Sequence, residues 1–125
     1  NKYEMVLTEN KANSLAMVVV DNGDGTVTFK AGDKFLFCDA NNVKLVDAQD
    51  DNTKFVLEET ETKGDYFIKC AVANYQGKAQ YLEVYSGYLT CYGMGTDTSI
   101  YTFKLEDATG ANGTITAPKR FENNV

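Results

Sequence analysis

The chain contains no histidine among its 125 residues. Catalytic Ser–His and Cys–His arrangements need an imidazole to accept the proton of the nucleophile, so neither can form within this chain. A zinc site is not expected either, because the three cysteines include no Cys-x-x-Cys pair and histidine cannot complete a ligand set. We therefore expect no metal and no cofactor.

Basic residues and long apolar runs are also scarce. Lys and Arg number 12 against 18 Asp and Glu, which gives a formal net charge of −6. Such a chain repels phosphates, and its basic residues are scattered rather than gathered in a stripe. The longest apolar run, Leu15 to Val20, is far shorter than the roughly 18 residues of a membrane-spanning helix. We therefore expect no nucleic-acid partner and no membrane insertion.

Carboxylates are plentiful, but their placement does not indicate catalysis. Glycosidases hold two acids on opposite sides of a substrate cleft. Glu58 and Glu59, like Asp50 and Asp51, are instead adjacent in sequence, and adjacent side chains diverge in extended backbone. The segment 21–25 lacks the alternating oxygen ligands and closing glutamate of a calcium-binding loop, so it predicts a hairpin turn. We interpret the carboxylates as a solvated acidic rim and expect the protein not to be an enzyme.

The composition of the chain favours β-structure. It contains eight Tyr, seven Phe and a single proline, Pro118. Runs of alternating apolar residues are separated by turns rich in Gly and Asn, and no window sustains a helical period. We therefore predict an all-β protein. The expected strands cover residues 3–8, 15–20, 26–31, 34–39, 43–47, 53–59, 65–72, 79–85, 88–92, 100–106 and 113–117.

Two long segments of the chain share one pattern. An aromatic-Leu pair at 35–36 is followed by a Phe-x-Leu element at 55–57, and the same order recurs at 81–82 and 103–105. Residues 5–7, Met-Val-Leu, form a partial third copy of the second element. The copies start about 50 residues apart, which is the length of one supersecondary unit. The sequence thus predicts an internal repeat of about four strands per unit.

This arrangement resembles the β-trefoil superfamily, in particular its fascin-like and ricin-type lectin branches, over residues 26–107. The resemblance implies a closed antiparallel barrel of four-stranded repeats. Its third unit would be built from both chain ends, with the strand at 3–8 closing the unit that begins near Gly113. Ricin-type lectins carry a Gln-x-Trp signature, which this chain lacks, so galactose binding of that kind is not expected. A calycin-type antiparallel barrel is the alternative fold.

The sequence also indicates where the domain ends. We expect a single all-β domain over residues 1–117, and we interpret residues 118–125 as a C-terminal tail or linker, because Pro118 and polar residues follow the last expected strand. A signal or anchor is not present in this chain, which begins at Asn1, and exported proteins lose such a segment by cleavage. We expect a protein that is extracellular or held at the cell surface.

The three cysteines share one sequence context. Each follows a leucine or an isoleucine by two positions, and residues i and i+2 of a strand lie on the same face. Cys38, Cys70 and Cys91 are therefore expected to point into the core as inert thiols. The alternative is one disulfide with one unpaired thiol, which requires an oxidising compartment.

Tyrosines crowd into the second unit and give the candidate binding site. Tyr85 and Tyr88 flank a two-residue turn, where their rings can stand exposed. An exposed ring stacks on the C–H groups of a sugar, while nearby amides bind the sugar hydroxyls. We predict Tyr85 and Tyr88 as ligand-binding residues, together with Asn74 and with Gln76 as an amide partner. The alternative is that the rings form cross-strand pairs that cover a barrel rim.

These features favour a non-catalytic binding module that recognises carbohydrate or a protein surface through exposed loops. One alternative is a protease-inhibitor-like or other protein-interaction domain, acting through a protruding loop such as residues 47–53 or 93–99. Another is a structural accessory domain of a larger secreted protein, with no ligand of its own. Free sugar would compete with a lectin, whereas an inhibitor would act stoichiometrically.

Overall fold

The structure, a computed structural model, describes residues 5–7, 17–40, 42–107, 113–115 and 121–123 of the chain. Within these residues every regular element is a strand, apart from two short 3₁₀ helices. The all-β prediction is confirmed. The strands are β1 (Met5–Leu7), β2 (Val18–Asp21), β3 (Val27–Ala31), β4 (Lys34–Cys38), β5 (Val43–Val46), β6 (Phe55–Glu59), β7 (Asp65–Tyr75), β8 (Lys78–Tyr85), β9 (Tyr88–Tyr92), β10 (Thr102–Asp107), β11 (Gly113–Ile115) and β12 (Phe121–Asn123), and the 3₁₀ helices are η2 (Asp51–Thr53) and η3 (Thr98–Tyr101).

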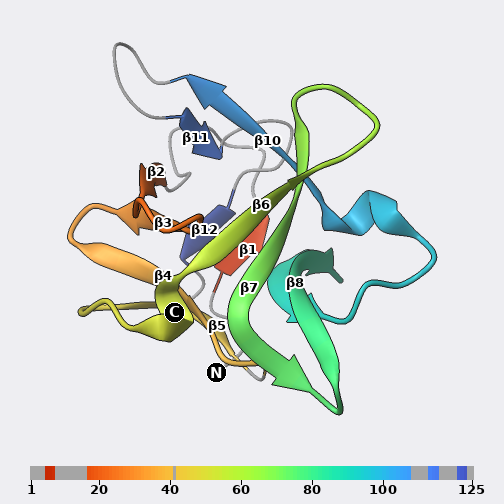
Figure 1. Cartoon of the computed structure of the whole chain (residues 1–125), viewed down its shortest axis with the longest axis horizontal. Coiled ribbons are helices and arrows are strands. Elements are labelled where there is room, and N and C mark those ends of the chain that lie inside the picture. The colour runs from red at the N-terminus through yellow and green to blue at the C-terminus, as the bar shows by residue number, and fades with distance from the viewer. Residues whose placement is uncertain (1–4, 8–16, 41, 108–112, 116–120, 124–125) are drawn as a thin grey trace.

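The strands pair in antiparallel fashion. β2 pairs with β3, β3 with β6, β6 with β7, β7 with β10, β10 with β11, and β11 with β2. Within this succession, β3–β6 and β11–β2 are joined by one residue pair each. The hairpin β4–β5 is attached to β3, and the hairpin β8–β9 is attached to β7. Figure 1 shows β6 and β7 running side by side through the middle of the molecule.

The first and last described strands meet in one antiparallel pair. The register runs from Met5 opposite Asn123 to Leu7 opposite Phe121. A strand therefore exists within the expected range 3–8, and β12 lies inside the range 118–125 that the sequence indicated as a tail or linker. β6 pairs with β3 and β7, and β10 pairs with β7 and β11. β1 pairs instead with β12 and β9. Residues 5–7 thus do not occupy the position of the other two Phe-x-Leu copies.

The core forms from alternating positions along the strands. In β4, Leu36 and Cys38 are buried while Phe35 is half-buried, as a period of two residues requires. The buried apolar side chains make up one cluster. Within it, Phe29 and Phe55 are fully buried, and their ring centroids lie 5.3 Å apart. Burial of each such ring stabilises the fold by about 1.5–3 kcal/mol.

All three thiols belong to this core, so their predicted burial is confirmed. The Cys70 thiol donates a hydrogen bond to Cys38 Sγ at 2.7 Å. Burial raises the pKa of Cys70. Hydrogen bonds from the Cys38 and Cys70 thiols lower the pKa of Cys91, the third member of the cluster.

Two tight turns set the registers of β7, β8 and β9. Residues 76–77 and 86–87 all have positive φ, between 52° and 82°. Positive φ at both central residues defines the type I′ turn, whose twist matches that of the flanking strands. The first turn makes Tyr75 the cross-strand partner of Lys78. In Figure 1 the tip of the β7–β8 hairpin extends away from the body of the molecule, at the lower right.

Candidate functional site

A small hollow of about 120 Å³ lies where the β7–β8 turn meets the end of β9. This volume is several times what one water molecule needs, so the hollow is more than a single-water site. Two of the lining side chains are large aromatics that stay exposed, Tyr75 at 49% and Tyr92 at 61%. We call this feature the tyrosine hollow. Its lining residues are Tyr75, Gln76, Lys78, Gln80, Tyr92 and Gly93.

The strand registers bring these distant residues together. The turn at 76–77 places Tyr75 opposite Lys78. The turn at 86–87 folds β9 back along β8, so that Tyr92 lies opposite Tyr81. As a result, β9 ends beside the start of β8, and Tyr92 and the residue after it reach the hollow.

Gln80 is the buried polar residue of the tyrosine hollow, with 2% of its surface exposed. Its Nε2 donates a hydrogen bond to the carbonyl oxygen of Lys78 at 3.1 Å. Its Oε1 accepts no hydrogen bond from the described residues, although an unpaired buried acceptor costs about 1–3 kcal/mol. Gln76 is exposed by contrast, and its Nε2 donates to Tyr75 Oη at 3.4 Å. The hollow therefore presents one buried amide and one exposed amide.

Gly93 shapes the hollow by having no side chain. A Cβ atom at this position would come within 3.1 Å of Lys78 Cδ, so the lysine stem lies directly against the glycine backbone. This packing holds the stem of Lys78 at the wall of the hollow. Lys78 takes part in none of the ion pairs formed within the described part of the chain.

The structure separates the four residues predicted to bind ligand into two groups. Gln76 lines the tyrosine hollow, and Asn74 lies beside it, where its Oδ1 accepts a backbone hydrogen bond within the turn at 3.0 Å. Tyr85 and Tyr88 pair with each other at the opposite end of β8. β8 is eight residues long, which separates the two groups by about 20 Å. One sugar ring cannot contact both groups.

Tyr75, Tyr92 and Gln80 were not predicted as ligand-binding residues. A signal for the first two exists in the sequence, because Gln76-Gly77 and Ser86-Gly87 both fit two-residue hairpin turns. A two-residue turn fixes the register of a hairpin, and the two registers together bring Tyr92 near the β7–β8 turn. The incomplete hydrogen bonding of Gln80 Oε1 has no signal in the sequence, because it depends on which side chains surround the hollow in the folded protein.

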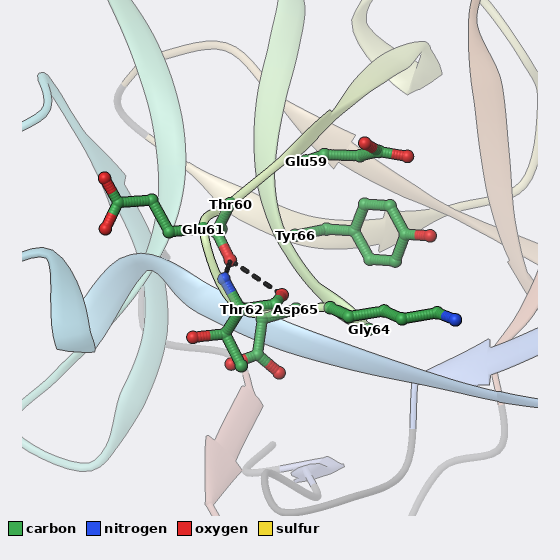
Figure 2. Close-up of a pocket in the computed structure, with 8 residues that line it drawn as sticks. Glu59, Thr60, Glu61, Thr62, Gly64, Asp65 and Tyr66 are labelled. Atoms are coloured by element: carbon green, nitrogen blue, oxygen red, sulfur yellow. Dashed lines mark hydrogen bonds between the residues drawn. The ribbon is translucent and has the colours of Figure 1, made fainter.

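A larger hollow of about 390 Å³ lies within the β6–β7 loop. Figure 2 shows Glu59 and Tyr66 pointing to the same side of this loop, whereas Glu61 points away. Asp65 is already paired with Lys104, its Oδ1 lying 2.6 Å from the lysine Nζ. The lining side chains carry three carboxylates and include no exposed large aromatic. The tyrosine hollow has the more suitable chemistry for stacking, despite its smaller volume.

A third hollow, of about 410 Å³, lies between the β2–β3 turn and η2. Its polar side chains bond to one another. Asn22 Nδ2 donates to Thr28 Oγ1 at 3.0 Å, and Lys54 Nζ lies 3.5 Å from an Asp24 oxygen and 3.9 Å from an Asp51 oxygen. No aromatic side chain lines this hollow. These polar contacts hold the two loops together and leave few groups for a ligand.

Tyr81, the cross-strand neighbour of Tyr92, is expected to make the stability of the protein depend on pH. Its hydroxyl donates to Glu58 Oε1 at 2.8 Å. Burial, and then the nearby Glu58 carboxylate, raise the pKa of Tyr81 to about 12 from 10.0. Since the folded-state pKa is the higher one, the stability from this group is complete below about pH 10 and is lost as the pH rises to about 12. We expect the melting temperature to fall over this interval by less in Tyr81→Phe than in the wild type, as followed by circular dichroism. An equal fall in both proteins would contradict the assignment.

No protein-family model matches this chain, and no curated protein matches its sequence. Among the described residues, no group of three or more His, Cys, Asp or Glu side chains could hold a metal ion. A helix of the length and apolar character needed to cross a membrane is likewise absent from the described ranges. The function of the site is therefore argued from its own geometry.

Proposed function

We propose that this chain is a β-trefoil-like binding module that recognises carbohydrate at the tyrosine hollow. The fold assignment is supported by the order of strand pairing, because β2, β3, β6, β7, β10 and β11 pair in a cycle that returns to β2. Six strands in this order correspond to the barrel of a trefoil. The pairs β4–β5, β8–β9 and β12–β1 then correspond to its three hairpins.

The pairing registers support a threefold relation. Strands β6, β10 and β2 hold equivalent places in the cycle. Two apolar residues with one residue between them recur at each place: Phe55 and Leu57 in β6, Phe103 and Leu105 in β10, and Met17, the residue before β2, with Val19 in β2. By this criterion the third copy of the Phe-x-Leu element is residues 17–19, Met-Val-Val, and not residues 5–7. The second apolar residue pairs with an apolar residue of the next strand in all three copies. These pairs are Leu57 with Ile68, Leu105 with Ile115, and Val19 with Phe29.

The observation that carries the binding proposal is the presence of two exposed tyrosines at a polar hollow. Tyr75 and Tyr92 expose about half of their surface or more to solvent. Their rings can cover the C–H face of a sugar, while the amides of Gln76 and Gln80 offer donors and acceptors to its hydroxyls. None of the lining residues carries a carboxylate, a thiol or an imidazole, so we propose binding without catalysis.

Replacing Tyr92 with alanine tests this proposal. We expect the binding of the protein to a glycan array, measured over a range of protein concentrations, to weaken by about tenfold, because the variant loses one stacked ring. Tyr85→Ala is the matched control. Tyr85 is exposed to a similar extent, 58% against 61%, and it lies on the same hairpin, four residues further along the strands and so about 13 Å away.

The two variants also separate the competing hypotheses. Loss of binding in Tyr85→Ala but not in Tyr92→Ala would move the site to the turn at 86–87, where the sequence predicted it. If no glycan binds and the protein inhibits a protease stoichiometrically, the protein-interaction alternative is correct. An extracellular or cell-surface location suits a carbohydrate-binding module and stays a prediction.

A further inference from the structure

Charge distinguishes the tyrosine hollow from the other two hollows. Each of the three is lined by one lysine. In the two larger hollows three carboxylates accompany that lysine, whereas none lines the tyrosine hollow. In a chain with a formal net charge of −6, the lining of the tyrosine hollow is distinct in carrying one positive charge and no negative charge. The carboxylates are Glu59, Glu61 and Asp65 in the β6–β7 loop, and Asp24, Asp50 and Asp51 beside η2.

The lysine of the tyrosine hollow differs in its surroundings from Lys54, the lysine of the third hollow. Lys54 lies within 4 Å of carboxylate oxygens on both Asp24 and Asp51. Lys78 makes no ion pair within the described residues, and its stem is packed against Gly93. A packed stem with an unpaired ammonium group is suited to an anionic ligand, since little side-chain freedom is lost when the ligand binds.

Gln80 adds a second requirement for the ligand, which is a hydrogen-bond donor. Its Oε1 is buried and accepts no hydrogen bond from the described residues, so a ligand that donates to it completes a bond that the protein leaves unmade. A hydroxyl group is such a donor, and sugars carry several. A site that hydrogen-bonds a hydroxyl also discriminates strongly against an analogue without one.

We infer that the tyrosine hollow selects acidic sugar units, which place a carboxylate at Lys78 Nζ and a hydroxyl at Gln80 Oε1. This inference rests on the proposed function and adds the chemical class of the ligand. The carboxylate is recognised by the one lining group that carries charge. The hydroxyl is recognised by the one lining group that is buried and incompletely bonded. The tyrosine rings then cover the apolar face of the same sugar.

A pair of sugars that differ only at C6 tests the inference. Methyl glucuronide and methyl glucoside share their ring and hydroxyl positions, and only the former carries a carboxylate. We expect isothermal titration calorimetry to give a dissociation constant about two- to fivefold lower for the glucuronide, as an ion pair with the exposed Lys78 provides. Methyl galacturonide and methyl galactoside form a second pair. Added NaCl should reduce the preference, because salt screens an exposed charge pair.

Three variants assign the preference to its residues. Lys78→Met keeps a long stem and removes the charge, so both sugars of a pair should bind equally, whereas Lys78→Arg should retain the preference. Gln80→Met fills the same space without a carbonyl oxygen and should weaken both sugars by about tenfold. Circular dichroism of each variant verifies its fold.

The outcomes separate this inference from the proposed function. Equal binding of acidic and neutral sugars by the wild type, lost in Tyr92→Ala, would overturn the inference and leave the proposed function standing. A preference for acidic sugars that survives in Lys78→Met would also overturn it. If neither sugar pair nor any array glycan binds, the proposed function itself is wrong.

Discussion

Replacing Phe55 with alanine is expected to lower the free energy of unfolding by about 3–5 kcal/mol. The side chain is fully buried, and its ring centroid lies 5.3 Å from that of Phe29. The same residue forms the one residue pair that joins β6 to β3, opposite Val27. The substitution removes buried apolar surface and leaves a cavity at this junction. For a chain of this size the melting temperature should fall by about 10–20 °C in a thermal unfolding experiment.

Phe35→Ala is the matched control for this prediction. It removes the same atoms from a half-buried ring on the outer side of β4, with Lys30 Nζ 5.9 Å from the ring centroid. Only a partial burial term and a surface cation–π contact are lost, so we expect a destabilisation of about 1 kcal/mol. Equal losses at the two positions would contradict the placement of Phe55 in the core.

Treating the folded protein with oxidised glutathione is expected to join Cys38 to Cys70 and to raise the free energy of unfolding by about 3–4 kcal/mol. The two sulfurs are in contact, and the residues are 32 positions apart, so the bond closes a long loop in the unfolded chain. Two thiols are oxidised to one disulfide, while one oxidised glutathione is reduced to two thiols. Cys91 is the least buried of the three thiols, with 8% of its surface exposed, and its neighbours lower its pKa. It is therefore expected to react first with glutathione, and exchange then passes the bond to the contacting pair.

Peptide mapping by mass spectrometry identifies the joined cysteines, and denaturant unfolding with and without reductant measures the gain in stability. Cys91→Ser should slow the reaction but leave the final disulfide unchanged, because Cys38 and Cys70 remain. Cys70→Ser should abolish the gain. A final disulfide that includes Cys91, or a Cys38–Cys70 bond without added stability, would refute this prediction.

The hairpins of this protein could be predicted from sequence because local chemistry decides them. Every strand except β12 overlaps an expected strand. Turns such as Ser86-Gly87 need positive φ at both central residues, and glycine and its neighbours mark them in the sequence. The burial of the cysteines was equally accessible, since Cys38 shares its face of β4 with Leu36.

The pairing between distant segments could not be predicted in the same way. β12 is three residues long, Phe121 to Asn123, and follows a proline and two basic residues. No local alternation distinguishes it from a tail, and its partner β1 lies at the other end of the sequence. The third copy of the Phe-x-Leu element could not be located from the sequence for the same reason. Residues 5–7 and residues 17–19 both fit a loose apolar pattern, and only the pairing of β1 and β2 distinguishes them.

The residues that line the tyrosine hollow could be predicted only in part, for a related reason. Aromatic crowding and nearby amides indicated β7, β8 and β9, the strands around the tyrosine hollow, and Gln76 is one of its lining residues. The grouping of Gln76 with Tyr85 and Tyr88 followed from closeness in sequence, whereas β8 extends between them. Tyr92 reaches the hollow from the far end of the β8–β9 hairpin, so contact there depends on two registers taken together.

The pairing of β1 with β12 means that strand pairing cannot be completed until β12 has been translated. Chains grow from the N-terminus at about 5–20 residues per second, so β1 and β2 leave the ribosome long before β11 and β12 exist. During that interval β3 to β10 can pair among themselves, but β1 and β2 each lack one partner. The nascent chain therefore carries open strand edges, which invite pairing with a second nascent chain. Translation of β11 and β12 removes this hazard, because these strands cover the open edges of β2 and β1.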